Sequence, residues 1–462
     1  MTSATLADAL AGFAVDISAD TVPAAVREQA ALCILDTLGC IVAGVETEEA
    51  RAFARAEREI AGDGSETPPI GIARALGYFG DVFELNDLVG GHASIGVVAA
   101  VLARTLHTRA TGDAMIDAVV AGNEVTSRLF ESEAWHQKAF DDSAIVVTSI
   151  LSAFGTAAAL ARLEGFDRER TREAMTIAGS LACWGPAEVI FGDGGTIKPS
   201  LFGAAPADSA FKAVAYARAG LTGPRRLVES ELGVMRAIAH EFEPAVVEGD
   251  GTWHLLGTQR KLHASCGFTH ASLDAIATLV REGVDVAGAE RVELHVPPYI
   301  IPAVAKDRLP VSPNDARFHL QFLAALAARG ADPILPRHSV GFAERLREPG
   351  VVETMGRMAV VPLSEGLEVE GQRYNVSRVR VTDGSGRVTA EASCDAPRGA
   401  SGNPMRSAQV VEKFRVLVGG VLGEELTEAC VAEALSLAGA PAAPAIRAAV
   451  ALALETAEHG GT

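Results

Sequence analysis

Positive charge is scarce in this sequence of 462 residues. Lysine and arginine together number 40 against 59 aspartates and glutamates, which gives a formal net charge of −19. No basic stripe is found, since the pair Arg225–Arg226 stands alone, and this argues against nucleic acid and anionic membranes as partners. A small anionic metabolite remains compatible, because a few cations converging in a cleft outweigh the net charge there.

Paired cysteines, aromatic residues and long apolar runs are also lacking. The six cysteines include no CxxC pair, so their spacing fits neither a zinc site nor a disulfide framework and favours a reducing cytoplasm. The most apolar stretches, 97–106 and 145–160, are too short or too interrupted to span a bilayer, and the N-terminus lacks the basic region of a secretory signal. Aromatic residues make up only 5%, while alanine and glycine are abundant, which predicts helices packed closely on helices.

What is present is a strong helical periodicity over the first half of the chain. The chain is long enough for two domains. Apolar residues recur at helical spacing, with capping residues ahead of several segments, and predict helices over 21–39, 73–83, 94–106, 111–129, 143–163, 168–182 and 204–219.

The pattern changes near residue 245 and changes back near residue 400. Alternating residues predict strands at 292–296, 368–370, 377–382 and 387–392, the last two joined in a hairpin, and helices are expected at 315–329 and 339–347. Helical character returns from Ser407 onward. We therefore predict a mainly α fold, in which both chain ends build a large all-helical domain (1–245 and 401–462) and a smaller α+β domain (246–400) is inserted.

The first candidate for chemistry is a polar loop at Phe83–Ser94, between two apolar helices. It contains the acids Glu84 and Asp87, then a Gly-Gly turn and His92. Functional side chains gather on loops that a rigid scaffold positions, so these three are candidate site residues. The competing interpretation is an ordinary interhelical loop whose Ser94 caps the next helix.

The second candidate is the Gly-rich segment 191–203, which carries Lys198. Its glycines let the backbone approach a ligand closely, and a lysine at the end of such a loop indicates an anion site. The spacing differs from that of a nucleotide P-loop, which makes a phosphate cradle a weak interpretation. The alternative is a flexible surface turn with a solvated lysine.

The third candidate gathers Lys261, His263, Cys266 and His270 within ten residues, just before an apolar helix. Histidine and cysteine are good metal ligands, but the spacing H-x2-C-x3-H matches no standard zinc pattern and no fourth ligand is apparent. A Cys–His nucleophilic pair is a second hypothesis. The simplest interpretation is that Cys266 is a small packed side chain and that His263 is exposed.

A fourth segment, 397–405, is rich in proline and glycine. This composition is typical of a hinge where the chain returns from one domain to another. Within it we single out Arg398, because a guanidinium can hold a carboxylate with two hydrogen bonds.

Taken in order, these segments resemble the MmgE/PrpD family, which includes 2-methylcitrate dehydratase, cis-aconitate decarboxylase and iminodisuccinate epimerase. The resemblance covers nearly the whole chain and rests on the number and order of its markers rather than on any one of them. The markers are Ile34-Leu-Asp-Thr-Leu-Gly, Asn86-Asp-Leu-Val-Gly-Gly-His-Ala-Ser, Ala121-Gly-Asn-Glu-Val-Thr-Ser-Arg-Leu, Phe154-Gly-Thr-Ala-Ala-Ala, Ile197-Lys-Pro-Ser-Leu-Phe-Gly-Ala-Ala, Gly220-Leu-Thr-Gly-Pro, the 261–270 block with Leu273-Asp-Ala, and Gly399-Ala-Ser-Gly-Asn-Pro-Met with Lys413-Phe.

The resemblance implies an active site between a two-ended helical domain and a smaller α+β domain, in a homodimer that uses no metal or organic cofactor. It places His92 at the family's loop histidine and Lys198 at its active-site lysine. Lys261 and His270 fall on the lysine and histidine of the later block.

The remaining correspondences include departures from the family pattern. Glu84 and Asp87 fall at the acidic positions before the loop histidine, in a loop two residues shorter than usual. Cys266 takes a position that is histidine in the decarboxylases, Phe322 one that is tyrosine there, and Asp141 one that is commonly histidine. Each of these last changes removes or alters a polar group of the expected pocket, which favours a different carboxylate as substrate.

The chemistry implied is that of a carbon next to a carboxylate in a small di- or tricarboxylic acid. We expect Lys198 and Lys261 to bind carboxylate, His270 to be the general base and His92 a second acid or base. Cys266 either packs or supplies a proton. Dehydration of a hydroxy acid is the leading hypothesis, with epimerisation and decarboxylation as alternatives, and an inactive scaffold or binding protein as the non-enzyme alternative.

Overall fold

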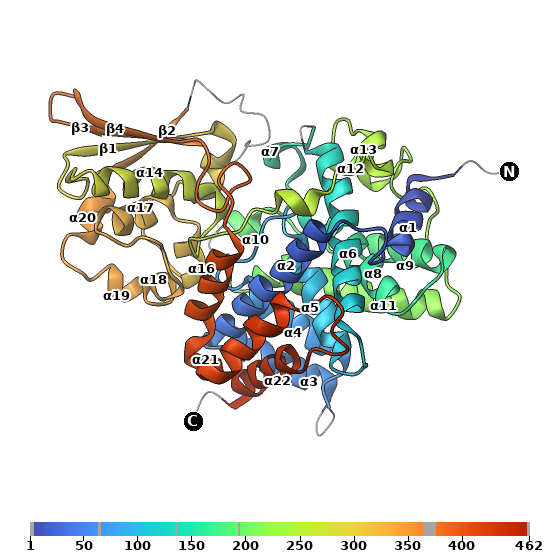
Figure 1. Ribbon diagram of the computed structural model, residues 1–462. Coiled ribbons are helices and arrows are strands. Elements are labelled where there is room, and N and C mark those ends of the chain that lie inside the picture. The colour runs from blue at the N-terminus through green and yellow to red at the C-terminus, as the bar shows by residue number, and fades with distance from the viewer. Residues whose placement is uncertain (1–3, 63–65, 135, 193–194, 364–375, 460–462) are drawn as a thin grey trace.

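The computed structural model describes residues 4–62, 66–134, 136–192, 195–363 and 376–459, and for Phe140 and Asp141 the backbone only. Figure 1 shows a large helical part and a smaller part that carries a sheet at one end of the molecule. The helices of the larger part are α1 (Leu6–Asp16), α2 (Ala24–Gly44), α3 (Glu48–Ala61), α4 (Pro69–Asp81), α5 (Ala93–Thr105), α6 (Gly112–Glu133), α7 (Phe140–Ser143), α8 (Thr148–Leu163), α9 (Arg168–Ser180), α10 (Glu188–Phe191), α11 (Ala205–Arg218), α12 (Val234–Ile238), α13 (Pro244–Glu248), α21 (Ser407–Leu435) and α22 (Pro444–His459).

Small residues set the spacing of the helical core. A Cβ added at Gly155 of α8 would lie 2.2 Å from the carbonyl oxygen of Gly122 in α6, so this helix pair packs with almost no side chain between the backbones. Both chain ends contribute to one buried apolar cluster, in which α21 packs along α2; Figure 1 shows the two helices side by side. The predicted fold class, mainly α with an α+β part, is confirmed, while the residue boundaries of the domains stay a prediction.

The smaller part consists of short helices packed on a mixed sheet. In the described residues the strand order is β2-β1-β3-β4, with β1 parallel to β2 and antiparallel to β3, and with β3 and β4 forming the predicted hairpin. The elements are α14 (His270–Arg281), β1 (Arg291–Val296), α15 (Ile301–Val304), α16 (Pro313–Arg317), α17 (Leu320–Ala328), α18 (Pro336–Val340), α19 (Phe342–Arg345), α20 (Val351–Gly356), β2 (Met358–Pro362), β3 (Ser377–Thr382) and β4 (Val388–Cys394).

Several elements differ from the sequence prediction for identifiable reasons. The helix expected at 315–329 is broken, because α16 ends at Arg317 and His319 caps the start of α17, where its side chain accepts a hydrogen bond from the Phe322 backbone nitrogen. Likewise, Gly341 divides the helix expected at 339–347 into α18 and α19. Strand β2 was not predicted because its burial does not alternate, and α3 was missed because its buried residues are only Ala50, Ala54 and Glu57. The strand expected at 368–370 lies outside the described residues.

Buried apolar contacts join the larger and the smaller part. The core of the smaller part includes Ile95, Val146, Ile190, Leu201 and Phe202, all of which come from the helical half of the chain. Burying such side chains stabilises the junction by roughly 1.5–3 kcal/mol each relative to exposing them. The junction is therefore a packed apolar interface, and both parts hold the side chains near it in place.

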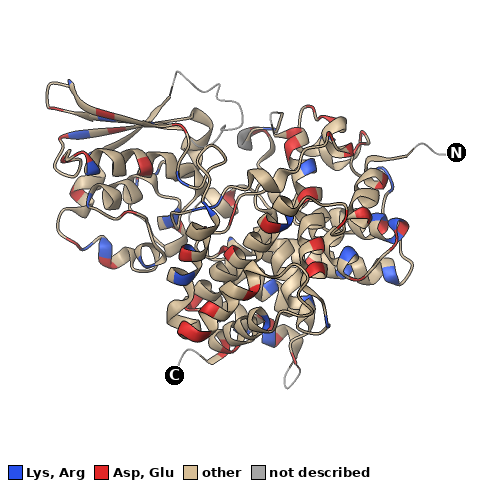
Figure 2. Ribbon diagram, viewed as in Figure 1, with Lys and Arg blue, Asp and Glu red and all other residues tan. Residues whose placement is uncertain are grey.

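Apolar helices and charged residues both occur throughout the described part of the chain. Within the described residues no single helix is long and apolar enough to cross a bilayer; α2 and α3 meet that criterion only as a pair bent by 92°. Figure 2 shows acidic residues spread over the helices, with lysine and arginine also where the two parts meet.

Candidate active site

The loop between α4 and α5 is buried and carries an unusual backbone conformation. Glu84 has φ +54°, a left-handed geometry that non-glycine residues adopt at a cost of roughly 1–2 kcal/mol. The predicted Gly-Gly turn is present, with φ +51° at Gly90 and +79° at Gly91. A Cβ at Gly90 would lie 2.8 Å from the Ser127 hydroxyl, so the close approach requires glycine. Strain of this kind persists only where surrounding contacts hold it.

Glu84 forms the centre of a buried chain of alternating charges. The Lys198 ammonium forms an ion pair with Glu84 Oε1 and lies 3.0 Å from Asp81 Oδ2. The Lys261 ammonium lies 2.8 Å from Glu84 Oε2. All four side chains are buried, which excludes the solvated surface lysine considered for Lys198.

Burial changes the protonation behaviour of these groups. Desolvation lowers the pKa of Lys198 to about 8, although the neighbouring Asp81 opposes the shift, and it also lowers the pKa of Lys261. Desolvation raises the pKa of Asp81, against the opposing charge of Lys198. A lysine with such a pKa can act both as a cation and as a proton donor near neutral pH.

Lys198 is positioned by a tight turn and by aromatic rings. After Pro199 the chain forms a π-helical turn, Ser200–Ala204, a geometry that is frequent at functional sites. The Lys198 ammonium lies 4.5 Å from the ring centroid of Phe202 and 5.5 Å from that of Phe318, distances at which rings attract a cation. Residues 193–194 of the Gly-rich segment lie outside the described residues.

This turn can lie against α4 only because glycines meet there. A Cβ added at Gly203 would lie 2.2 Å from the carbonyl oxygen of Gly77. We expect Gly203→Ala to destabilise the protein by roughly 1–3 kcal/mol, because the turn must move away from α4. The midpoint of thermal unfolding measures this loss. Gly420→Ala is the matched control: nothing lies within 4 Å of its Cβ position in α21, so its midpoint should stay equal or rise slightly. Equal midpoints for Gly203→Ala and wild type would contradict the close packing.

His92 stands directly before α5 and faces the same lysines. Its ring stacks on Phe202 with centroids 4.5 Å apart, and the Asn86 amide nitrogen lies 3.1 Å from its Nδ1. Burial and the charge of Lys261 hold the pKa of His92 well below its ordinary value. With Nδ1 accepting from Asn86, Nε2 carries the proton and can donate to an oxygen of a ligand. Ser94 does not cap α5; its hydroxyl accepts a hydrogen bond from Asn123.

The segment from Lys261 to His270 approaches from the smaller part. His270 begins α14, and its Nε2 donates to the carbonyl oxygen of Ser265 at 3.2 Å, which leaves Nδ1 as the basic nitrogen. Burial, with the nearby His263 and Lys261, holds its pKa well below the ordinary value, so the imidazole is neutral at pH 7. Burial raises the pKa of Cys266, with Lys261 opposing, so its thiol is protonated. A neutral thiol weakens the hypothesis of a Cys–His nucleophilic pair.

His263 is buried, and its expected exposure was wrong. Its Nδ1 accepts from the backbone nitrogen of Ile334 at 3.1 Å, so Nε2 donates to Asp274 Oδ1, also at 3.1 Å. The chain between 261 and 270 folds inward, because this histidine links two segments of the smaller part. Its ring lies edge-on to His270 with centroids 5.0 Å apart, which supports the orientation of His270.

Arg398 completes this network. It donates to Asp274 from its backbone nitrogen at 2.6 Å and from Nε at 2.8 Å, and its Nη2 also pairs with Asp332. Burial by itself would raise the pKa of Asp274, but hydrogen bonds from His263 and Arg398 hold this pKa below its ordinary value. Ligand atoms of His263, Asp274 and Asp332 lie within 4.8 Å of one another, the spacing of a metal site, but the guanidinium already supplies the positive charge there.

A small cleft lies between Arg398 of this network and Lys261. It is lined by Leu88, Gln259, Arg260, Lys261, Gly267, His270, Pro397, Arg398, Gly399 and Ala400. The structure therefore brings together Glu84, Lys198 and Lys261, with His92, Cys266 and His270 beside them, and sets Arg398 at the edge.

Asp87 lies near Lys261, and its charge opposes the lowering of the Lys261 pKa, but it is not part of the ion pairs that join Asp81, Glu84 and the two lysines. Burial, together with the negative charge of Asp36, raises its pKa to about 6. The predicted pocket position of Asp141 cannot be placed, because its side chain lies outside the described residues.

Sequence reasoning missed Asp81, Phe202, Phe318 and Arg317. Asp81 is an isolated acid in an apolar helix, which is a usable signal, whereas the rings and Arg317 give none. Arg317 is fully buried; its Nη2 lies 3.5 Å from Glu49 Oε2, and its Nε donates to the Ser339 hydroxyl at 3.0 Å.

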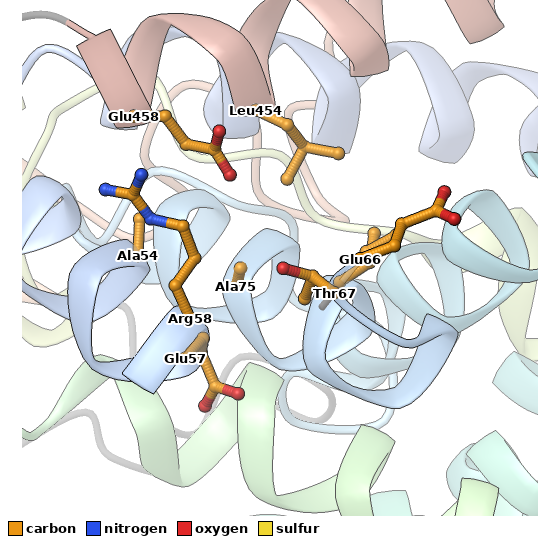
Figure 3. A pocket seen from close by; sticks show the side chains of 9 residues that line it. Ala54, Glu57, Arg58, Glu66, Thr67, Ala75, Leu454 and Glu458 are labelled. Atoms are coloured by element: carbon orange, nitrogen blue, oxygen red, sulfur yellow. The ribbon is translucent and has the colours of Figure 1, made fainter. Parts of the chain in front are cut away.

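A larger cavity lies elsewhere, among α3, α4 and α22. It has a volume of about 180 Å³, and Figure 3 shows Leu454 and Glu458 of α22 facing Ala54 of α3 across it. Its one well-buried acid, Glu57, is engaged by Arg74 at 2.9 Å. The described residues that line it include no histidine or lysine, and none of them belongs to the lysine cluster, so it is not the candidate for chemistry.

Both halves of the chain match models of known protein domains. The model of the MmgE/PrpD N-terminal domain matches residues 8–246, and that of the MmgE/PrpD C-terminal domain matches residues 263–437. Two cis-aconitate decarboxylases of Aspergillus terreus are 23% and 24% identical to the chain, over 453 and 455 residues. In both cases the similarity covers 89% of this chain and 89% of the relative.

Proposed function

The chain belongs to the MmgE/PrpD family, and from that premise we propose that it is a lyase that removes water from a small hydroxy di- or tricarboxylic acid, without a metal or organic cofactor. The observation that carries the proposal is the buried arrangement of Lys198, Glu84 and Lys261 with neutral His270 beside it. Membership of the family supports a lyase. That the reaction is a dehydration is the more specific part of the proposal.

Carboxylate binding follows from the position of Glu84. Its two oxygens contact two different ammonium groups, so the lysines already hold one carboxylate in a site without bulk water. A substrate carboxylate can share or take that place, and in a dry site the attraction is much stronger than in water. The same cations stabilise the negative charge that develops when the neighbouring carbon loses a proton.

Dehydration also needs a base and an acid, and both are present. Nδ1 of His270 accepts the proton as the C–H bond breaks, since the ring is neutral. The C–O bond then breaks, and the leaving hydroxide takes a proton from an ammonium group, for which Lys198 has a suitable pKa of about 8. His92 donates from Nε2 to a carboxylate oxygen. Water leaves, and His270 returns its proton to the lysine through solvent.

Decarboxylation is the second candidate, because the two relatives are named cis-aconitate decarboxylases. Cys266 or Lys198 would then protonate the vacated carbon. A panel of di- and tricarboxylates, incubated in D2O, separates the outcomes: dehydration lowers the mass by water, decarboxylation releases CO2, and epimerisation incorporates deuterium without other mass change. We expect loss of water; CO2 release or simple deuterium uptake would overturn the choice of dehydration.

The pH dependence of substrate binding is a direct prediction. Lys198 is a cation below its pKa of about 8 and neutral above it. Carboxylate affinity should therefore be constant below about pH 7 and fall as pH rises through about 8. The pH profile of kcat/KM measures the alkaline limb. An affinity that stays constant to pH 10 would show that Lys198 does not bind the substrate as a cation.

The non-enzyme alternative is an inactive scaffold. The partner proposed for the enzyme is a small carboxylate. A thermal-shift screen with the same acids distinguishes the two: stabilisation by at least one acid supports the proposed site, and none would favour a scaffold. We further propose a cytoplasmic homodimer, for which light scattering should give twice the mass of the chain.

A further inference from the structure

The orientation of Glu84 depends on contacts made by its neighbours. The left-handed backbone at Glu84 aims its carboxylate between the two lysines. On the N-terminal side, the Glu84 backbone nitrogen donates to Asp81 at 3.1 Å. On the C-terminal side, the next residue, Leu85, is held at its carbonyl oxygen, and contacts on both sides of a strained residue are what keep its conformation in place.

A lysine of the C-terminal helix α21 provides that contact. Lys413 donates from Nζ to the carbonyl oxygen of Leu85 at 2.7 Å, and it forms an ion pair with Asp36 Oδ1 of α2 at 2.8 Å. Its side chain is 5% exposed. A buried ammonium is tolerated only where charge and hydrogen bonds compensate its lost hydration, and both partners here are fixed by the fold.

The docking of α21 does not depend on Lys413 alone. The helix also packs through Val411, Phe414 and Val418, whose side chains are buried in the helical core. Replacing Lys413 leaves these apolar anchors in place, while both the Leu85 carbonyl and the Asp36 carboxylate lose their charged partner. Lys413 therefore links the loop to the pair of helices α2 and α21.

We propose that Lys413 is a positioning residue that holds Glu84 between Lys198 and Lys261 for the reaction. The expected effect of Lys413 on catalysis rests on the proposed function, whereas its expected effect on the position of the loop does not. Without Lys413 the loop relaxes, Glu84 withdraws, and the two lysines lose a shared counter-ion and repel each other more strongly. The titratable groups that act on these lysines from the surrounding elements are Cys40, Asp81, Glu84, Asp87, His92, Cys266 and His270.

The kinetic test compares Lys413→Met with Lys413→Arg. Methionine keeps the apolar stem but donates nothing, so kcat/KM should fall about 10-fold or more, the effect of losing one charge-assisted hydrogen bond. The alkaline limb of the pH profile should also move down by about one pH unit, because the lysines lose a counter-ion. Arginine can reach both partners and should restore the limb. Arg447→Met is the matched control: Arg447 of α22 donates to the Leu106 carbonyl at 3.1 Å, away from the loop, and its loss should leave the profile unchanged.

Hydrogen exchange of the ligand-free protein supplies a measurement independent of turnover. In Lys413→Met the backbone amides of Glu84 and Leu88, which donate to Asp81 and Gln259, should exchange at least about 10-fold faster, while α2 and α21 keep wild-type protection. Unchanged loop exchange together with an unchanged alkaline limb would overturn the proposal, and faster exchange throughout α21 would make Lys413 a packing residue. If wild type converts none of the acids, the proposed function fails while the exchange result still decides the role of Lys413.

Discussion

Lys198→Met will lower kcat/KM by roughly 10²- to 10³-fold, because the variant loses a preorganised cation at the place where negative charge develops. The same change leaves the carboxylates of Asp81 and Glu84 buried without their shared counter-ion. Removing one partner of a buried pair costs about 3–5 kcal/mol, so the variant should also unfold at lower temperature. Steady-state kinetics and thermal unfolding measure the two effects separately.

A second variant separates catalysis from stability. Glu84 keeps its ion pair with Lys261 in Lys198→Met, so adding Asp81→Leu removes the carboxylate that has lost its partner and should recover part of the lost stability without recovering turnover. Lys212→Met is the matched control, since Lys212 pairs with Asp208 at 2.6 Å on the surface of α11 and a surface pair contributes about 0.2–1 kcal/mol at most. Turnover near the wild-type level in the stabilised double variant would remove Lys198 from the mechanism.

His270→Gln is expected to lower turnover by roughly 10²-fold or more, because glutamine cannot accept a proton as imidazole does. Glutamine can still donate to the Ser265 carbonyl, so the start of α14 should keep its structure. The neutral form of His270 persists far below pH 7, since burial lowers its pKa. The acid limb that this base contributes should therefore lie well below neutral pH in wild type.

His295→Gln provides the control for a histidine substitution in the same part of the molecule. His295 lies on strand β1, where its Nε2 is 3.2 Å from Glu293 Oε2. This contact involves no lysine of the site. Its loss should change turnover less than about twofold. A folded His270→Gln variant with turnover close to that of the control would exclude His270 as the base and direct attention to His92.

Local patterns allowed much of the helical part and the hairpin to be predicted. Apolar periodicity located α4, α5 and α8, and the alternation before and after Asp383-Gly-Ser-Gly located β3 and β4. These signals are local, because they depend on which face of one element is apolar. This apolar periodicity is weak in α3, because its buried face is mostly alanine. It is also weak in β2, because the burial of its residues does not alternate.

The candidate site was predictable in its residue types but not in its pairing. Lys198, Lys261 and Glu84 were each identified, yet nothing in the sequence indicated that one carboxylate would contact both ammonium groups. Such pairing depends on three segments that meet only after folding, since Lys261 follows Glu84 at a sequence separation of 177. The burial of His263 was mispredicted for the same reason, since its partners Ile334 and Asp274 are set by the packing of the smaller part.

The contact between Lys413 and Leu85 spans 328 residues, and it has a consequence for how the chain folds. Helix α2 is made early in synthesis, yet part of its apolar surface is covered only when α21 emerges from the ribosome. Contacts of such sequence separation slow folding, because a long loop must close before they contribute. The nascent helical half therefore carries an uncovered apolar strip for most of its synthesis, which is the type of surface that chaperones bind and that aggregates when they are absent.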